Sequence, residues 1–235
     1  MSDPIRSFDE STLATFPATF ELLEEQGVLT PTVTLGGLRA LLSADQRAIV
    51  DQIIDLDPRD YGVGTPYAGD LEPVPADLVK VSGQQHTEHG EQQTMSDKYL
   101  PRHVFDAYVR MNDAFMAEHT DRRLLIQSGY RSPAYQVVVF INWLINGYAG
   151  DIAKTIRHAS PPRYSQHTIA SKAAIDFRNI DGRPSSGNPE DFKDTIEYAW
   201  LRRHGGTFSF YESWLEGNEY GMRAEPWHWQ YRSSS

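Results

Sequence analysis

Two histidines, an aspartate and a glutamate in the second half of the sequence are the side chains best suited to a metal-assisted reaction. His167, Asp176 and the pair Glu225 and His228 lie in three separate short segments. Two imidazoles and one carboxylate are the usual protein ligands of a catalytic zinc ion, which keeps a fourth position for water. A second carboxylate beside that water could act as the base. By spacing alone, polar groups satisfied by hydrogen bonds in the core are the more common explanation.

The segment Glu225-Pro226-Trp227-His228 carries a geometric requirement. Residues three apart on a regular strand face opposite sides of the sheet. Glu225 and His228 can therefore converge only if the chain bends between them. Pro226 has a fixed φ and no N–H to donate, which favours an irregular start to an edge strand.

The remaining six histidines have simpler interpretations. His86 and His89, within QQHTEHGEQQ, could form a local metal clasp with Glu88 or Glu91. That segment has no strong structural pattern, so a solvated loop is the preferred interpretation. The other four are expected to be structural or surface residues, because they have no acidic partner at ligand spacing: His103, His119, His158 and His204.

Composition narrows the classes of function further. The 235 residues carry a formal charge of −10, which opposes binding to nucleic acid. The absence of cysteine excludes thiol nucleophiles, disulfides and thiolate metal sites. No apolar run approaches the roughly 20 residues that span a bilayer. The sequence does not indicate an oligomeric state. The N-terminus as written has no secretory pattern, which predicts a cytoplasmic protein; action at the cell wall would need release or a missing leader.

The elements that must position these side chains follow from periodicity. Apolar spacing predicts helices over 11–26 and 38–56, and residues 57–97 suggest a long connection with little regular structure. We therefore expect a helical N-terminal extension with its connecting loop over 1–95 and a second domain over 96–235.

The second domain alternates helical and strand patterns. Helices are predicted over 100–118, from Pro133 to about 148, and over 191–203. Short strands are predicted over 124–127, 173–177, 207–211 and 227–231. The expected fold class is α+β, with helices packed on a small antiparallel sheet.

An ordered set of short motifs resembles one family. The set is Ser128-Gly129-Tyr130-Arg131-Ser132, Tyr135-Gln136, Ser165-x-His167, Ala174-x-Asp176 and Glu225-x-Trp227-His228. In this order it resembles the VanY-like D,D-carboxypeptidases of the LAS group of zinc peptidases, which includes D-alanyl-D-alanine dipeptidases, phage endolysins and the Hedgehog domain. The resemblance covers about residues 124–231.

The resemblance implies a role for each matched residue. His167, Asp176 and His228 would be the ligands of a Zn²⁺ ion, and Glu225 the catalytic base. Arg131 would steady the substrate carbonyl. Ser165 and Gln136 would line the site near the carboxyl end of the substrate.

One departure concerns the interval between two of the implied ligands. The family places the aspartate seven residues after the histidine, with a glycine between, whereas Asp176 follows His167 by nine. Two extra residues preserve strand parity, so Asp176 can still face a metal if the excess bulges out before Ala173.

The resulting expectation is a zinc metallopeptidase of the cell wall, a carboxypeptidase that removes a terminal D-alanine from peptidoglycan stem peptides. Alternatives of the same chemistry are a D-alanyl-D-alanine dipeptidase and an L-alanyl-D-glutamate endolysin. A zinc-bearing binding module without turnover is a further alternative, against which Glu225 argues. A non-haem iron oxygenase also uses two histidines and a carboxylate, but its carboxylate usually follows the first histidine by two residues.

Overall fold

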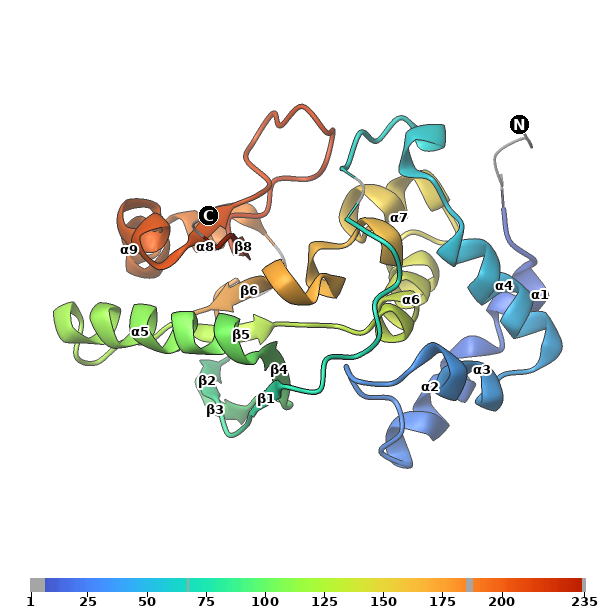
Figure 1. The fold of residues 1–235 in the computed structure, drawn as a ribbon, viewed down its shortest axis with the longest axis horizontal. Coiled ribbons are helices and arrows are strands. Elements are labelled where there is room, and N and C mark those ends of the chain that lie inside the picture. Colours follow the sequence, from blue (N-terminus) through green and yellow to red (C-terminus); the bar gives the residue numbers. More distant parts are fainter. Residues whose placement is uncertain (1–6, 67, 185–187, 234–235) are drawn as a thin grey trace. The chain divides into compact units, whose positions relative to one another are not determined.

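The computed structural model describes residues 7–66, 68–184 and 188–233, and it confirms an α+β fold with a small antiparallel sheet (Figure 1). The described residues form two compact units. The first contains residues 7–74, 131–168 and 218–223, and the second contains 75–130, 169–217 and 224–233. No helix among the described residues has the length and apolar character needed to cross a membrane. The predicted boundary near residue 95 stays a prediction.

The first unit is helical. Each helix predicted at the N-terminus is broken in two. In the first, Pro17 stands at the start of α2. In the second, Ser43 begins α4 with a capping box completed by Gln46. The elements of this unit are α1 (Glu10–Leu13), α2 (Phe16–Glu25), α3 (Leu35–Leu41), α4 (Ala44–Ile54), η1 (Pro58–Tyr61), α6 (Pro133–Asn142), η2 (Trp143–Gly147), α7 (Ile152–His158), η3 (Pro162–Tyr164) and η4 (Gln166–Thr168).

Helix α6 begins where the sequence predicts. Pro133 occupies its first turn, and the Ser132 hydroxyl accepts the N–H of Tyr135 as the N-cap. The helix ends at Asn142, but the chain continues as a turn of π-helix over Trp143–Gly147. A β-carbon at Gly147 would lie 2.5 Å from the Trp143 ring, so any larger residue would require this ring to move.

The second unit contains the sheets. Its elements are β1 (Leu78–Val81), β2 (Gln85–Glu88), β3 (Glu91–Thr94), β4 (Lys98–Pro101), α5 (Arg102–Glu118), β5 (Leu125–Ser128), η5 (Ala170–Lys172), β6 (Ala174–Arg178), α8 (Pro189–Lys193), α9 (Ile196–His204), η6 (Gly205–Phe208), β7 (Phe210–Glu212) and β8 (His228–Tyr231). The main sheet has the order β5-β6-β8-β7, and every neighbouring pair is antiparallel. On one face, Tyr108 of α5 stacks on Phe177 of β6.

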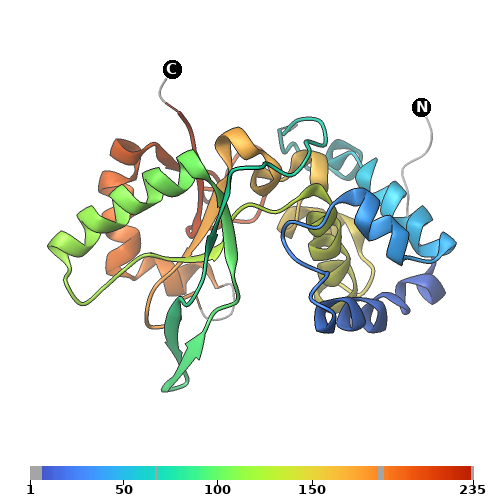
Figure 2. The same ribbon diagram turned by 60° about the horizontal axis from the view of Figure 1, so that its bottom comes forward.

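Four expectations about local structure need correction. Residues 57–97 are not a structureless connection, because β1 and β4 pair and continue into the β2–β3 hairpin (Figure 2). His89 and Gly90 both have positive φ, as a two-residue hairpin turn requires, so the QQHTEHGEQQ segment is a hairpin. The helix predicted over 191–203 is divided into α8 and α9 because Thr195 caps a new start. The strand predicted over 207–211 begins only at Phe210.

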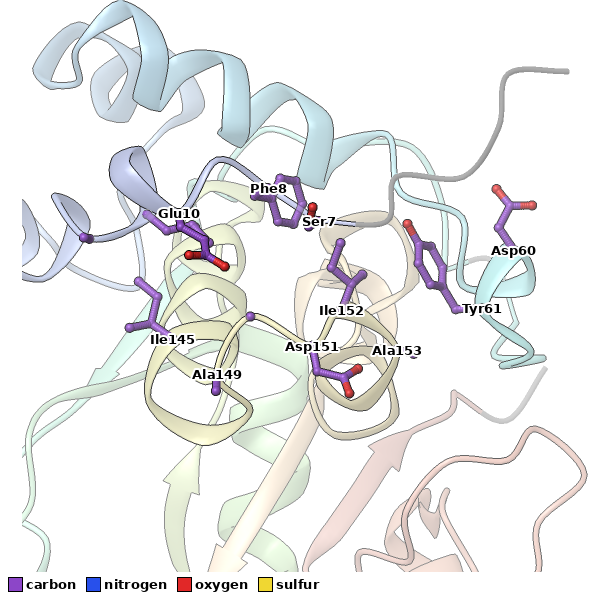
Figure 3. A pocket seen from close by; sticks show the side chains of 13 residues that line it. Ser7, Phe8, Glu10, Asp60, Tyr61, Ile145, Ala149, Asp151, Ile152 and Ala153 are labelled. Atoms are coloured by element: carbon purple, nitrogen blue, oxygen red, sulfur yellow. The ribbon is translucent and has the colours of Figure 1, made fainter.

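The first unit also contains a pocket of about 760 Å³ (Figure 3). Buried Phe8 and Ile152 contribute apolar surface, and the carboxylates of Glu10, Asp60 and Asp151 are among the polar groups that line it. None of the predicted site residues lies in its lining.

Candidate metal centre

Asp176 and His228 are held side by side by the main sheet. They are paired in register on β6 and β8, and Nδ1 of His228 lies 2.8 Å from Oδ1 of Asp176. Neighbouring residues alternate between the faces of a strand, so Ile175 and Trp229 point to the opposite, apolar side, where both are buried. The sheet thereby separates a polar pair from the core.

The chain bends before His228, as the sequence requires. The His228 N–H donates to the Glu225 carbonyl at 2.9 Å, which closes a turn with Pro226 at its second position. The Trp229 indole N–H donates to the Pro226 carbonyl at 2.9 Å and holds the turn against the strand. Glu225 is only 9% exposed, so its carboxyl group is brought near the start of β8 in a mostly buried setting.

An aromatic residue that the sequence reasoning missed packs on the same histidine. Trp214 stacks on the His228 ring with centroids 5.9 Å apart and an interplanar angle of 30°. Its carbonyl also accepts the N–H of Glu225 at 3.0 Å. Trp214 therefore fixes the ring of one residue and the backbone of the other. The pattern Glu-Ser-Trp-Leu-Glu around Trp214 carries no periodic signal that could have indicated this.

His167 lies in a tight succession of turns. The Ser165 hydroxyl accepts the His167 N–H at 3.3 Å, and the Thr168 hydroxyl contacts the carbonyls of Ser165 and Pro162. The His167 carbonyl accepts the N–H of Arg131 at 3.0 Å. Ser165, predicted to line the substrate site, is 4% exposed and acts here as a hydroxyl cap of the loop.

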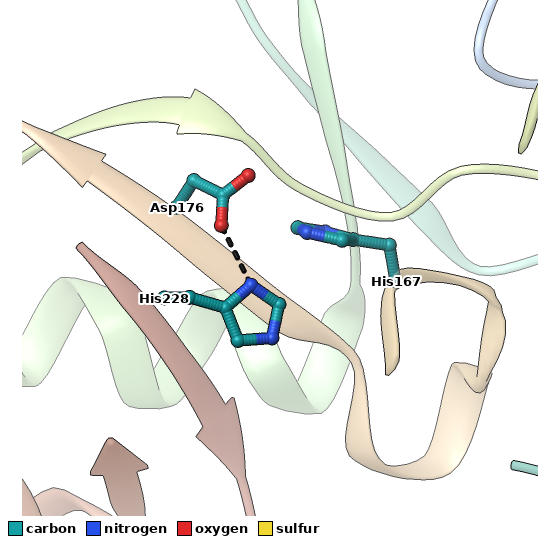
Figure 4. A group of neighbouring side chains, drawn as sticks. All are labelled: His167, Asp176 and His228. Carbon is teal, nitrogen blue, oxygen red and sulfur yellow. Dashed lines mark hydrogen bonds and ion pairs between the residues drawn. The ribbon is translucent and has the colours of Figure 1, made fainter. Parts of the chain in front are cut away.

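The structure brings the three predicted ligands together. One ligand atom from each of His167, Asp176 and His228 lies within 4.8 Å of the other two (Figure 4). Imidazole nitrogen and carboxylate oxygen are donors that a zinc ion binds. Two imidazoles and one carboxylate leave a single negative charge for a divalent cation. The group fits a metal ion, and its assignment as the ligand set stays a prediction.

The two-residue difference between His167 and Asp176 is taken up before β6. Residues Ala170–Lys172 form the single 3₁₀ turn η5, in which the Lys172 N–H donates to Ile169. Ser171 and Lys172 are exposed, whereas Ala173 and the strand that follows are buried. The excess thus bulges outward and leaves the parity of Asp176 on β6 unchanged.

Arg131 is held through its guanidinium as well as its backbone. Its Nη1 donates to Oε1 of Gln136 at 3.0 Å, and Nε2 of Gln136 donates to the Ser160 carbonyl at 2.9 Å. Tyr135 lies nearby; burial raises the pKa of its phenol, and the Arg131 cation opposes this shift. Tyr135 therefore stays protonated at neutral pH.

The residue after Arg131 joins this segment to the N-terminal helices. The Ser132 N–H donates to the Pro31 carbonyl at 2.8 Å, and its hydroxyl lies 2.6 Å from the Val33 carbonyl. Ser132 has no exposed surface. The loop before α3 therefore supports the segment that carries Arg131, a role that periodicity could not reveal.

A family comparison identifies the class of protein. The family model described as "VanY: D-alanyl-D-alanine carboxypeptidase" matches residues 97–234, more than half of the chain. The chain belongs to this family of D-alanyl-D-alanine carboxypeptidases, as the ordered motifs indicated. A comparison with curated proteins found no match.

One solved structure shares the fold, and two others are less similar. An LdcB LD-carboxypeptidase is 24% identical, with a TM-score of 0.55 and coverage of 74% of this chain and 77% of that one. VanYB in complex with D-alanine-D-alanine is 21% identical, with a TM-score of 0.44 and coverage of 72% and 86%. A vancomycin-resistance D,D-pentapeptidase VanY variant in complex with Zn(II) is 22% identical, with a TM-score of 0.43 and coverage of 72% and 87%.

Proposed function

We propose that this protein is a zinc-dependent peptidase that removes the terminal D-alanine from peptidoglycan stem peptides. The observation that carries the proposal is the grouping of His167, Asp176 and His228. Membership of the D-alanyl-D-alanine carboxypeptidase family supports both the hydrolytic reaction and the choice of substrate. Nitrogen and oxygen donors in a set of three suit a catalytic zinc ion.

The bound zinc ion would lower the pKa of a coordinated water towards about 7. Glu225 is the residue that takes the proton from the attacking water onto its carboxylate and passes it to the leaving amine nitrogen. Its position in the turn before His228, with its N–H held by Trp214, fixes its backbone beside one of the ligands. Its low exposure restricts access of bulk water to this proton.

Arg131 supplies the positive charge for the substrate carbonyl. Attack on an amide places negative charge on the carbonyl oxygen, and a fixed donor directed at that oxygen lowers the barrier. Removal of one such donor costs about 3–4 kcal/mol of barrier, or 10²–10³ in rate. The hydrogen bond from the Arg131 N–H to the His167 carbonyl links this donor to the segment that carries the first predicted ligand.

The test is incubation of the zinc-loaded protein with peptides that end in D-Ala-D-Ala, in D-Ala after an L-residue, or in an internal L-Ala-D-Glu bond. Product masses identify the bond that is cleaved. Loss of one D-alanine from the first peptide supports the proposal. Release of the intact D-Ala-D-Ala dipeptide would instead indicate a dipeptidase. Cleavage of only one of the other two peptides would indicate another peptidase that uses the same chemistry.

A substitution separates catalysis from mere binding. Glu225→Gln should keep bound zinc and lose hydrolysis, while the exposed Glu216→Gln should change neither. Metal analysis by mass spectrometry measures whether zinc stays bound and also distinguishes zinc from iron. A parent protein that binds the peptides without turnover would instead indicate a binding module.

A further inference from the structure

We propose that Gln136 is a positioning residue for Arg131, which it holds in the orientation needed to meet the substrate carbonyl. This inference rests on the proposed function, because it acts through the role assigned there to Arg131. The sequence expectation that Gln136 lines the substrate site stays a prediction, and the role inferred here is additional to it. Gln136 is 1% exposed, so both ends of its amide need partners within the protein.

The amide of Gln136 has a polar contact at each end. Oε1 accepts from Nη1 of Arg131 at 3.0 Å, and Nε2 donates to the Ser160 carbonyl at 2.9 Å. The reverse orientation of the amide would place nitrogen against the guanidinium donor and oxygen against a carbonyl acceptor. The two partners therefore determine the orientation of the amide, and with it the acceptor that Arg131 meets.

The type of side chain at position 136 follows from the same two contacts. A glutamate could accept from Arg131 but could not donate to Ser160 when ionised, so two oxygens would repel each other. An apolar residue of the same length would leave the buried Ser160 carbonyl without this hydrogen-bond donor. Such an unsatisfied buried group lowers the stability of the folded protein. Only a long side chain with both an acceptor and a donor satisfies both partners.

Arg131 is thereby fixed at its two ends. Its N–H donates to the His167 carbonyl, and the next residue, Ser132, caps α6, from whose first turns Gln136 projects. An arginine side chain has several rotatable bonds and loses substantial rotamer freedom when it is held. Catalytic donors act best when they are oriented before the reaction begins. Gln136 supplies that orientation, and the helix supplies the rigid support.

A double-mutant cycle tests the inference. Arg131→Met should lower kcat by about 10²–10³-fold, with a smaller change in KM. Gln136→Met should lower kcat by about 10–10²-fold, as small misplacement of a catalytic group does. In the Arg131→Met background, Gln136→Met should cost less than about twofold more, because its target is gone.

Gln46→Met is the control for loss of a buried glutamine. Gln46 is also buried, and its amide donates to Thr15 and Thr19 on α2 and its N-terminal cap, away from Arg131. This variant should lower stability without a matching loss of kcat. If Gln136→Met lowers kcat equally in the parent and in the Arg131→Met background, the positioning role is overturned. If Arg131→Met leaves kcat unchanged, the proposed function of Arg131 fails, and the inference fails with it.

A measurement on the parent protein does not depend on folding of a variant or on turnover. The Nε–Hε group of Arg131 should give an NMR order parameter close to that of rigid backbone, about 0.85. In Gln136→Met the value should fall below about 0.6, the range of flexible groups. A flexible Arg131 in the parent would overturn the inference even if the peptide assay showed no hydrolysis at all.

Discussion

Gly129→Ala should destabilise the protein strongly, although alanine adds only one methyl group. A β-carbon at Gly129 would lie 2.5 Å from the Tyr99 carbonyl oxygen and 2.9 Å from Cδ2 of Leu100, and Leu100 is fully buried. The next residue, Tyr130, donates its N–H to the same Tyr99 carbonyl at 2.7 Å. The methyl group can be accepted only if the two segments separate, which also weakens this hydrogen bond.

The two contributions set the magnitude. Overpacking of a buried site costs about 1–3 kcal/mol, and a lost hydrogen bond costs about 0.5–1.5 kcal/mol. The free energy of unfolding should therefore fall by about 2–4 kcal/mol, which for a chain of this size lowers Tm by roughly 5–15 °C.

Gly36→Ala is the control for this prediction. Gly36 lies in the first turns of α3, and a β-carbon there would meet no atom within 4 Å. Alanine should stabilise this helix by about 0.5–1 kcal/mol. Thermal unfolding followed by circular dichroism measures both variants. A Gly129→Ala protein that melts within about 1 °C of the parent would refute the reasoning about Tyr99 and Leu100.

Three further predictions concern other parts of the protein. Asp176→Ala should weaken zinc binding, measured by calorimetry, by more than about 100-fold. The change would remove the carboxylate from the three proposed ligands, which should cost more than the loss of an outer-shell partner. Burial, and then the charge of Arg178, lower the pKa of His86 below its ordinary 6.5. As pH falls, His86 therefore binds a proton in the unfolded chain before it does so in the folded protein. The free energy of unfolding should therefore fall below pH 6.5, and a denaturant series should show a smaller fall in His86→Gln. Ser132→Ala removes the N-cap of α6 and the contact with Val33, and should cost about 1–3 kcal/mol in the same denaturant assay.

The fold class could be predicted because most elements carry local signals. Helix α5 follows from its apolar face, α6 from Pro133, and the strands β5, β6 and β8 from short apolar runs. The β2–β3 hairpin was missed because its strands are polar on both faces and its turn uses His89-Gly90, where asparagine or aspartate before glycine is the usual signal.

The candidate site was predicted only in part, for a different reason. The motifs named His167, Asp176 and His228, and the proline in the last motif indicated the bend before β8. What supports these side chains comes from residues far away in sequence, such as Trp214 against His228. Such contacts depend on tertiary packing, and a periodic pattern in one sequence contains no information about them.

The bonds between Ser132 and the loop before α3 bear on where the protein can be divided. The stretch that is homologous to the family begins at residue 97, but the acceptors for the Ser132 N–H and hydroxyl lie at Pro31 and Val33. A fragment cut at the homology limit would remove both acceptors of Ser132 and expose the apolar side of α6 next to Arg131. For this chain, we therefore expect the smallest piece that folds on its own to begin well before the limit of homology at residue 97.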